Sequence, residues 1–295
     1  MGMLDQLPEG AQKYIKSQMD YNLNVDFDDR SLIGDDPDDF SDVVYGNADV
    51  EGPDALHGTH VSGIIGAVRG NELGGDGVAE NVKIMVLRAV PNGDEFDKDI
   101  ALAVRYAVDN GADVINMSFG KAYSPHQKEV YAAFKYADKK GVLLIHAAGN
   151  DAKDIDVEPN FPTSKYSFQD KPLDHFVTIG ASTKDKGAEL VASFSNYGAI
   201  GVDVFAPGFE IYNAVPQSEY MNLQGTSMAA PMVAGAAAML KSYYPELSMK
   251  EIKEVLYSTS VKYPKVEGFA DKSVSGGVVN LYKAAKACKK LAKKK

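Results

Sequence analysis

The chain has 295 residues, and its 31 Lys and Arg against 41 Asp and Glu give a formal net charge of −10. This length supports one large α/β domain or two ordinary ones, and 45% hydrophobic with 24% charged residues excludes a disordered or fibrous protein. The acidic balance argues against a nucleic-acid partner, and no apolar run approaches the 18 residues of a membrane span. A single cysteine, Cys288, excludes an internal disulfide and a cysteine zinc cluster, and we expect it to be a bystander.

The N-terminal part differs in charge from the rest of the chain. Residues 1–19 predict a short polar helix, with neither the basic nor the apolar region of a signal peptide. Residues 20–54 carry twelve acidic side chains and one cation, Arg30, so they account for −11 and the remainder for about +1. The simplest interpretation of this run is a solvated loop. Aspartate-rich loops also bind calcium, but the spacing here is not that of an EF-hand.

From residue 56 onward, apolar runs alternate with segments of helical periodicity. The expected strands are 82–90, 114–119, 142–147, 176–181 and 202–205, and the expected helices are 98–110, 127–140 and 227–243. A capping box, Ser248 to Glu251, begins a further helix. This order predicts a three-layer α/β domain, a mostly parallel sheet with helices on both faces. In such a sheet the functional site lies at the carboxyl ends of the strands.

Three short segments carry residues suited to acyl-transfer chemistry. His57 begins the run His-Gly-Thr-His-Val-Ser-Gly, where a histidine in a first helical turn can act as a general base; a metal pair with His60 is the alternative. Ser227 lies in Gly-Thr-Ser-Met-Ala-Ala-Pro at the start of an apolar helix, where it is either a nucleophile or a simple cap. Asn150 follows Ala-Ala-Gly after a strand, and it is either an oxyanion donor or a turn residue.

Together these segments resemble the subtilisin-like serine proteases, the subtilase family, over about residues 55–285. The resemblance implies a serine endopeptidase acting on polypeptides, with His57 as base, Ser227 as nucleophile and Asn150 as oxyanion donor. It implies a secreted or periplasmic protein that requires no cofactor, and it divides the chain into 1–54, the peptidase domain 55–285 and a lysine-rich tail, 286–295. It places the walls of the substrate pocket at Ser118, Phe119, Gly120, Ala147, Ala148 and Gly149.

The family's third catalytic residue, an aspartate that ends an apolar strand before Ser/Thr-Gly, has no clear counterpart. Asp26 and Asp28 are the nearest candidates, but neither is followed by Ser/Thr-Gly. Two further explanations are that the strand lies outside this sequence or that the protein lacks it and is impaired. Loss of that strand would leave a sheet edge open to a second copy, a dimer, or covered by residues 10–30.

Two further segments carry weaker signals, and one alternative function is open. The loop 71–77 resembles the family's calcium-binding loop in its placement, with Asn71 as a ligand. Asp151, Asp154 and Asp156 either favour a basic residue at the cleavage position or form a solvated loop. The alternative function is a catalytically silent module that binds extended peptides. A nucleotide-binding protein is not supported, because neither Walker A nor Gly-x-Gly-x-x-Gly is present.

Overall fold

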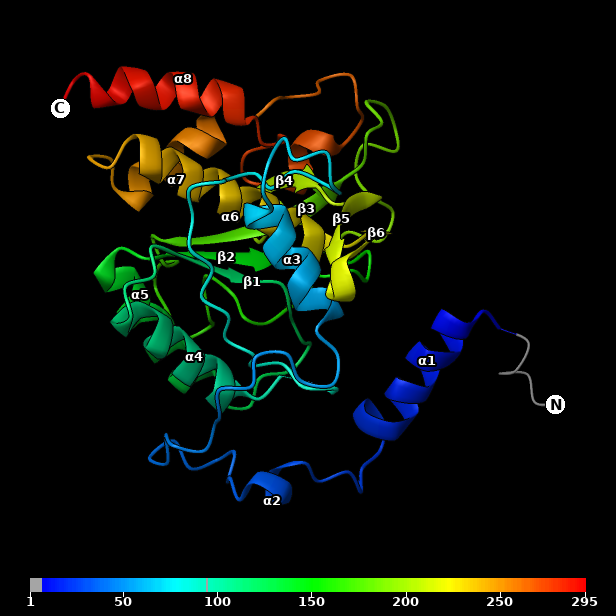
Figure 1. Ribbon diagram of the computed structural model, residues 1–295. Coiled ribbons are helices and arrows are strands. Elements are labelled where there is room, and N and C mark those ends of the chain that lie inside the picture. Colours follow the sequence, from blue (N-terminus) through cyan, green and yellow to red (C-terminus); the bar gives the residue numbers. More distant parts are fainter. Residues whose placement is uncertain (1–6, 94) are drawn as a thin grey trace.

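The computed structural model describes residues 7–93 and 95–295 (Figure 1). The helices are α1 (Glu9–Ser17), α2 (Arg30–Ile33), α3 (Leu56–Gly66), α4 (Asp97–Asp109), α5 (Gln127–Lys140), α6 (Thr226–Tyr243), α7 (Met249–Ser258) and α8 (Leu281–Ala292). A π-helical turn, η2 (Gln18–Asn22), follows α1, and two 3-10 turns are η3 (Pro216–Ser218) and η4 (Phe269–Lys272). The strands are β1 (Val114–Met117), β2 (Leu143–Ala147), β3 (Phe176–Ser182), β4 (Val204–Pro207), β5 (Ile211–Val215) and β6 (Glu219–Leu223).

Four of the strands form a parallel sheet in the order β1-β2-β3-β4. Every residue of β2 and β3 is buried, as expected for apolar strands covered on both faces. Their register is set by pairs such as Ile145 with Val177 and Ile179 with Val204. The predicted strands from residue 114 onward are therefore confirmed, as is the α/β fold class.

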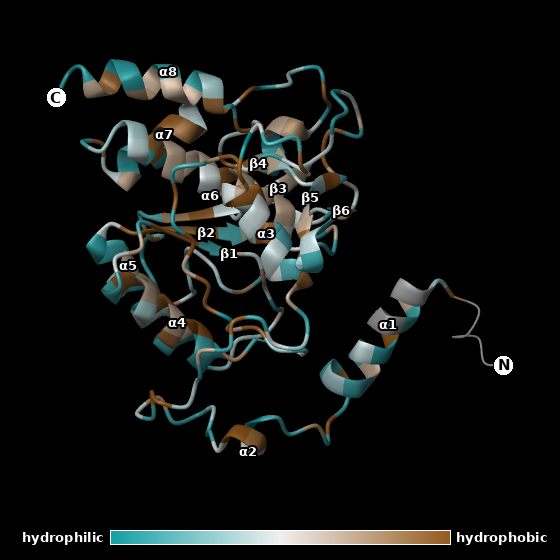
Figure 2. Ribbon diagram, in the orientation of Figure 1, coloured by the Kyte–Doolittle hydropathy of each residue, from teal (hydrophilic) through white to brown (hydrophobic). Residues whose placement is uncertain are grey.

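Helices cover the two faces of this sheet and make three layers. One core cluster joins β1 and β2 to α4 and α5, and a second joins β2, β3 and β4 to α6, α7 and α8. Hydrophobic residues accordingly concentrate in the sheet between the helices (Figure 2). No helix in the described part of the chain is long and apolar enough to span a membrane.

The central helix α6 packs closely because its residues are small. Most of its side chains are buried, and Ala229, Ala230 and Ala237 are completely so. At Gly235 an added Cβ would lie 2.7 Å from Cβ of Val78 and 3.3 Å from the carbonyl oxygen of Ile65, so the chain that follows α3 touches the backbone of α6 there. Glycine is required at this close approach.

The expected strand at 82–90 is wrong. The segment makes no backbone hydrogen bond to another described residue, and Ile84, Met85 and Val86 are each more than two-fifths exposed. Ala89 packs against the cluster that contains Met117 of β1, whose only partner in the sheet is β2. An apolar run becomes a strand only where a neighbouring strand accepts its hydrogen bonds, and here that neighbour is absent among the described residues.

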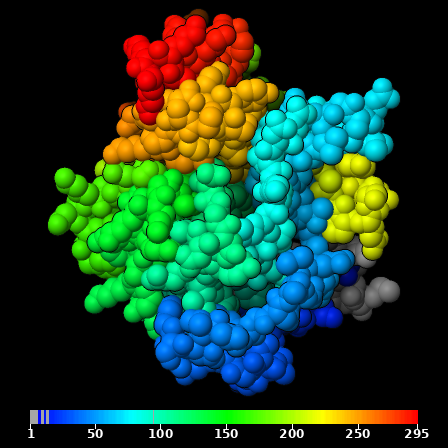
Figure 3. Space-filling view, turned by 60° about the vertical axis from the view of Figure 1, so that its left-hand side comes forward, coloured from blue at the N-terminus to red at the C-terminus, as the bar shows by residue number. Residues whose placement is uncertain are grey.

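The N-terminal part does not cover the open side of β1. Helix α1 and the turn η2 stand apart from the sheet (Figure 1), so the expectation that residues 10–30 cover that edge is wrong. The following residues, 30–45, instead lie against the start of α4 and the segment before α5, along the lower side of the molecule in Figure 3. The acidic run is therefore not simply a solvated loop.

The C-terminal residues form the packed helix α8 rather than a free tail. Asn280 caps its start by accepting a hydrogen bond from the N–H of Lys283. Cys288 is completely buried in the cluster of β2–β4 and α6–α8, so it packs in the core, and its lack of a chemical role stays a prediction. The predicted tail 286–295 thus belongs for most of its length to α8. The capping box of Ser248 and Glu251 is confirmed at the start of α7.

We expect Ile179→Ala to destabilise the domain by about 2–5 kcal/mol, because it opens a cavity in the fully buried centre of β3. Urea denaturation followed by circular dichroism measures the change. The control is Ile200→Ala, whose side chain is 79% exposed and whose effect should stay within about 0.5 kcal/mol. Equal effects of the two variants would contradict this assignment of the core.

Candidate active site

The first turns of α3 and α6 lie at the same end of two neighbouring helices. Val61 and Ile64 of α3 cluster with Met228 of α6. Further along both helices, the carbonyl oxygen of Ile65 lies next to Gly235. The two helices therefore advance side by side in the same direction. His57, one turn before Val61, and Ser227, next to Met228, consequently lie at the same end.

Ser227 is held against the carboxyl end of β1. Its Oγ donates to the carbonyl oxygen of Ser118 at 3.2 Å, and Oγ of Ser118 donates to the carbonyl oxygen of Ser227 at 2.9 Å. The backbone N–H of Ser227 makes no hydrogen bond to any described residue. An N–H at a helix N-terminus that lacks a partner is available to a negatively charged atom of a ligand.

Asn150 is fixed to the same helix start from the end of β2. Its Oδ1 accepts from both the N–H and the hydroxyl of Thr226, at 2.9 and 3.0 Å. The Thr226 hydroxyl in turn accepts from the N–H of Gly149 at 3.0 Å. With the oxygen occupied in this way, the amide nitrogen of Asn150 faces away from these contacts and keeps its donor capacity.

His57 makes no hydrogen bond to a described residue, and it is exposed. The protein around it nevertheless desolvates the ring, and this effect, followed by the nearby His60, lowers the pKa of His57 below its ordinary value. Asp54 acts in the opposite direction. The neutral imidazole, the form that accepts a proton, is therefore favoured at neutral pH.

His60 has a structural role in this arrangement. It is completely buried, and its Nε2 lies 3.0 Å from the carbonyl oxygen of Ile211 and 3.2 Å from that of Met221. These contacts tie α3 to the hairpin of β5 and β6. Burial lowers the pKa of His60, so it is neutral as well. With Nε2 engaged by carbonyl oxygens, the alternative of a metal pair with His57 has no support here.

The two predicted pocket walls are brought together from different parts of the sheet. Gly120 and Gly149 both face Asn160. Its Nδ2 would lie 3.0 Å from a Cβ added at Gly120 and 3.3 Å from a Cβ added at Gly149. Asn160 donates to the carbonyl oxygen of Ala148 at 2.9 Å and so closes the space between the walls. Among the wall residues, Ala147 and Ala148 are buried, whereas Ser118, Phe119 and Gly149 are half-buried.

Two wall-supporting residues escaped the sequence analysis. His146 in β2 lies with Nε2 2.8 Å from the carbonyl oxygen of Phe119, and burial lowers the pKa of His146 to about 4. Asn196 donates to the carbonyl oxygen of Ala148 at 2.9 Å and accepts from two N–H groups of the loop after Asn150. Neither could be found from local pattern, because each acts on a residue tens of positions away.

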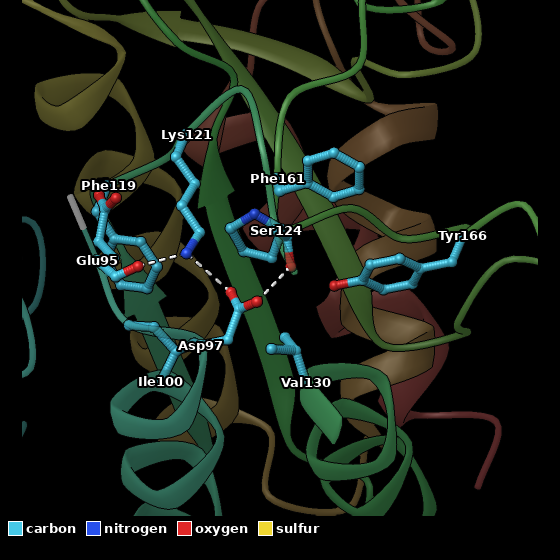
Figure 4. A pocket seen from close by; sticks show the side chains of 10 residues that line it. Glu95, Asp97, Ile100, Phe119, Lys121, Ser124, Val130, Phe161 and Tyr166 are labelled. Carbon is cyan, nitrogen blue, oxygen red and sulfur yellow. Dashed lines mark hydrogen bonds and ion pairs between the residues drawn. The ribbon is translucent and has the colours of Figure 1, made fainter. Parts of the chain in front are cut away.

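A small pocket lies behind the first wall, between the start of α4 and residues 119–124 (Figure 4). The ammonium of Lys121 lies 2.9 Å from Asp97 and donates to the carbonyl oxygen of Glu95. The Glu95 carboxylate accepts from the N–H of Gly120 at 3.0 Å. The hydroxyl of Tyr166 points toward this polar group in Figure 4 and has no described partner.

Residues 14–282 match the model of the subtilase family. The chain belongs to this family. It is 38% identical over 205 residues to the thermophilic serine proteinase of Bacillus sp. (strain AK1), an alignment that covers 69% of this chain and 46% of that protein. It is 36% identical over 229 residues to thermitase of Thermoactinomyces vulgaris, covering 77% of this chain and 74% of that protein.

A solved structure gives the same result for the fold of this subtilase. A protease of Pseudoalteromonas arctica superimposes with a TM-score of 0.66 at 31% identity, covering 79% of this chain and 70% of that one. The chain spans only about half of the Bacillus proteinase. The family match begins at residue 14, before the acidic run 20–54, so the boundary at residue 54 stays a prediction.

The loop predicted to bind calcium uses its polar side chains on its own backbone. Asn71 accepts from the N–H of Leu73, and Asp76 accepts from the N–H of Gly70, both at 3.0 Å. In the described part of the chain, no three His, Cys, Asp or Glu side chains gather as a metal site. Calcium at this loop remains a prediction, and the mechanism proposed below uses none.

The three aspartates after Asn150 divide between loop structure and solvent. Asp156 accepts from the N–H groups of Ile200 and Gly201, and Asp154 accepts from the N–H of Asp156. Asp154 and Asp156 therefore stabilise the loop that follows Asn150. Asp151 is exposed and forms no side-chain bond to a described residue. A preference for basic residues at the cleavage position thus rests on Asp151 alone and stays a prediction.

We expect the pKa of His57 to lie below its ordinary value of about 6.5 and to fall further in Asp54→Asn. Removing this carboxylate takes away a charge that favours the imidazolium, while the asparagine oxygen can still accept from the N–H of Leu56. NMR titration of the imidazole resonances measures both values. Asp49→Asn, which alters a similar turn without acting on His57, is the control. A rise of the pKa in Asp54→Asn would contradict this electrostatic assignment.

Proposed function

We propose that this subtilase is a serine endopeptidase in which Ser227 is the nucleophile, His57 the general base and Asn150 the oxyanion donor. The observation that carries the proposal is the start of α6. There Ser227 lies between the end of β1 and the end of β2, bonded to Ser118 on one side and adjacent to the Thr226–Asn150 contact on the other.

In the proposed reaction His57 removes the proton from Oγ of Ser227 while that oxygen attacks a peptide carbonyl carbon. The carbonyl oxygen becomes negative and accepts hydrogen bonds from the Asn150 amide and the N–H of Ser227. His57 then gives its proton to the leaving amine as the carbon–nitrogen bond breaks. Water, deprotonated by His57, hydrolyses the remaining ester and regenerates Ser227.

The substrate is proposed to be an extended polypeptide lying along residues 118–120. Here the N–H of Phe119 and the carbonyl oxygen of Gly120 have no hydrogen-bond partner among the described residues. Such groups at a strand edge bind extended peptides by adding a strand, and side-chain pockets then select residues. The pocket closed by Asn160 would take the side chain before the cleaved bond, between Gly120 and Gly149. By family resemblance we propose a secreted or periplasmic location.

The site shows no hydrogen-bonded carboxylate partner for the proposed base, His57, among the described residues. No carboxylate among the described residues is hydrogen-bonded to His57. Asp28 accepts from the N–H groups of Arg30 and Ser31, its own neighbours, and the exposed Asp26 forms no side-chain bond to a described residue. Neither candidate from the sequence therefore serves His57 in this structure. This observation favours the second candidate function, a silent peptide-binding module.

Loss of the aspartate reduces turnover but does not abolish nucleophile activation. In subtilisin, a member of the same family, its removal costs roughly four orders of magnitude, less than loss of serine or histidine. A strand added at the free edge of β1 and parallel to it would end at the same side of the sheet as Ser118. An aspartate at that end would lie on the side where His57 is found. A second copy of the chain, forming a dimer, is the alternative occupant of this edge.

We expect a fluorophosphonate probe to label the wild-type chain at Ser227, because the probe reacts only with an activated serine. Ser227→Ala should abolish labelling and His57→Ala should slow it at least tenfold, whereas Ser218→Ala, an exposed serine, should not change it. Mass spectrometry of the labelled peptide identifies the site. A folded wild-type chain that stays unlabelled would identify the protein as the silent peptide-binding module.

We expect a synthetic peptide of five apolar residues followed by Asp-Ser-Gly to accelerate this labelling. Its strand would pair with β1 and its carboxylate would stabilise the imidazolium of His57. The matched control has Asn in place of Asp: it should bind equally, as measured by fluorescence anisotropy, without accelerating the reaction. Equal acceleration by the two peptides would show that the strand, not the carboxylate, is responsible.

A further inference from the structure

The lone cation of the acidic run is buried and holds that run against α4. Arg30 is only 7% exposed, and its guanidinium donates to Asp35 at 2.8 Å and to both carboxylate oxygens of Asp99. The guanidinium carbon lies 3.7 Å from the centre of the Phe96 ring. Stacked and bidentate contacts of this kind are specific to arginine.

Further contacts join the same segment, residues 30–45, to both sides of the pocket wall. Lys98, completely buried, donates to the Asp35 carboxylate and, at 2.9 Å, to the carbonyl oxygen of Asp36. On the other side the Asp38 carboxylate lies 2.7 Å from Nε2 of His126. The segment therefore contacts the start of α4 and the residue just before α5.

Phe96, the residue on which Arg30 stacks, lies between the two acidic residues that hold the pocket wall. Before it, Glu95 accepts from the N–H of Gly120 at 3.0 Å. After it, Asp97 accepts from the hydroxyl of Ser124 at 2.8 Å and pairs with Lys121 at 2.9 Å (Figure 4). A shift of Phe96 would move both carboxylates, and with them the backbone at Gly120.

We infer that Arg30 is a positioning residue for the substrate wall at Ser118–Gly120, acting through Phe96 and Glu95. The inference rests on the proposed function, because the wall matters only if peptides bind along it. The acidic segment 30–45 is thus a brace for the substrate-binding edge. Removal of Arg30 weakens the contact of the segment with α4 and loosens the edge at Gly120, while Asn150 keeps its bonds to Thr226.

Hydrogen exchange at the Gly120 amide tests the inference without requiring catalysis. In Arg30→Met the exchange rate of this amide should rise about tenfold, because its acceptor Glu95 directly precedes Phe96, which loses its contact with Arg30. Arg30→Lys keeps the positive charge but cannot make the two parallel hydrogen bonds to Asp99, so it should give an intermediate exchange rate at Gly120. Asp99→Asn, which leaves Arg30 with Asp35, is the second variant should Arg30→Met fail to fold.

The matched control is Arg105→Met, which removes an exposed arginine of α4 whose guanidinium lies over the Tyr136 ring. It should leave exchange at Gly120 unchanged. The double variant Arg30→Met/Glu95→Ala should exchange no faster than Glu95→Ala alone, because Glu95→Ala already removes the oxygen that accepts from Gly120. An unchanged Gly120 rate in folded Arg30→Met and Asp99→Asn, or additive effects in the double variant, would overturn the inference.

A functional measurement separates this inference from the proposed function. In the Ser227→Ala background, which cannot cleave, we expect Arg30→Met to weaken binding of dye-labelled β-casein about tenfold. In the chain with Ser227 intact, we expect Arg30→Met to change the rate of fluorophosphonate labelling much less than it changes casein binding, because the small probe carries no peptide to lie along the wall. Labelling lost while casein binding still depends on Arg30 would refute the peptidase and retain the brace. Normal labelling with casein binding independent of Arg30 would refute the brace alone.

Discussion

The site depends on the hydrogen bonds that join the start of α6 to the ends of two parallel strands. Ser118 and Ser227 exchange hydroxyl-to-carbonyl bonds, and Asn150 accepts from Thr226. Parallel strands end on one side of a sheet, so a buried helix that begins there gathers groups far apart in sequence. Because five of the eleven buried residues of α6 are alanine and one is glycine, the helix approaches the sheet closely enough for such short bonds.

Strands could be predicted correctly where an apolar run in the sequence also has neighbouring strands in the structure. The apolar runs that became β2 and β3 are continuous and flanked by helices, and each has a strand on both sides. Residues 82–90 show the same pattern, yet they form no strand. Apolar composition alone cannot supply hydrogen-bond partners, so the sequence could not reveal that the described chain offers this segment no neighbour.

The candidate site was predictable for a different reason. A nucleophile at a helix start, with glycine and small residues around it, is a local requirement and leaves a short motif around Ser227. The supports of the walls leave no such motif. His146 bonds to Phe119 and Glu95 to Gly120 across 27 and 25 positions, and ordinary helix and strand residues can fill such roles. Only the packed structure shows which of them do.

The charge of the N-terminal run illustrates the same limit. Twelve carboxylates beside one arginine look like a solvated segment, because exposed charges contribute little to packing. The desolvated Arg30 reverses that interpretation. A buried guanidinium is tolerated only with close counter-charges, and one of its two partners, Asp99, belongs to α4 rather than to the run. The contacts of Arg30 with Asp99 and of Lys98 with Asp35 therefore place the acidic segment against α4.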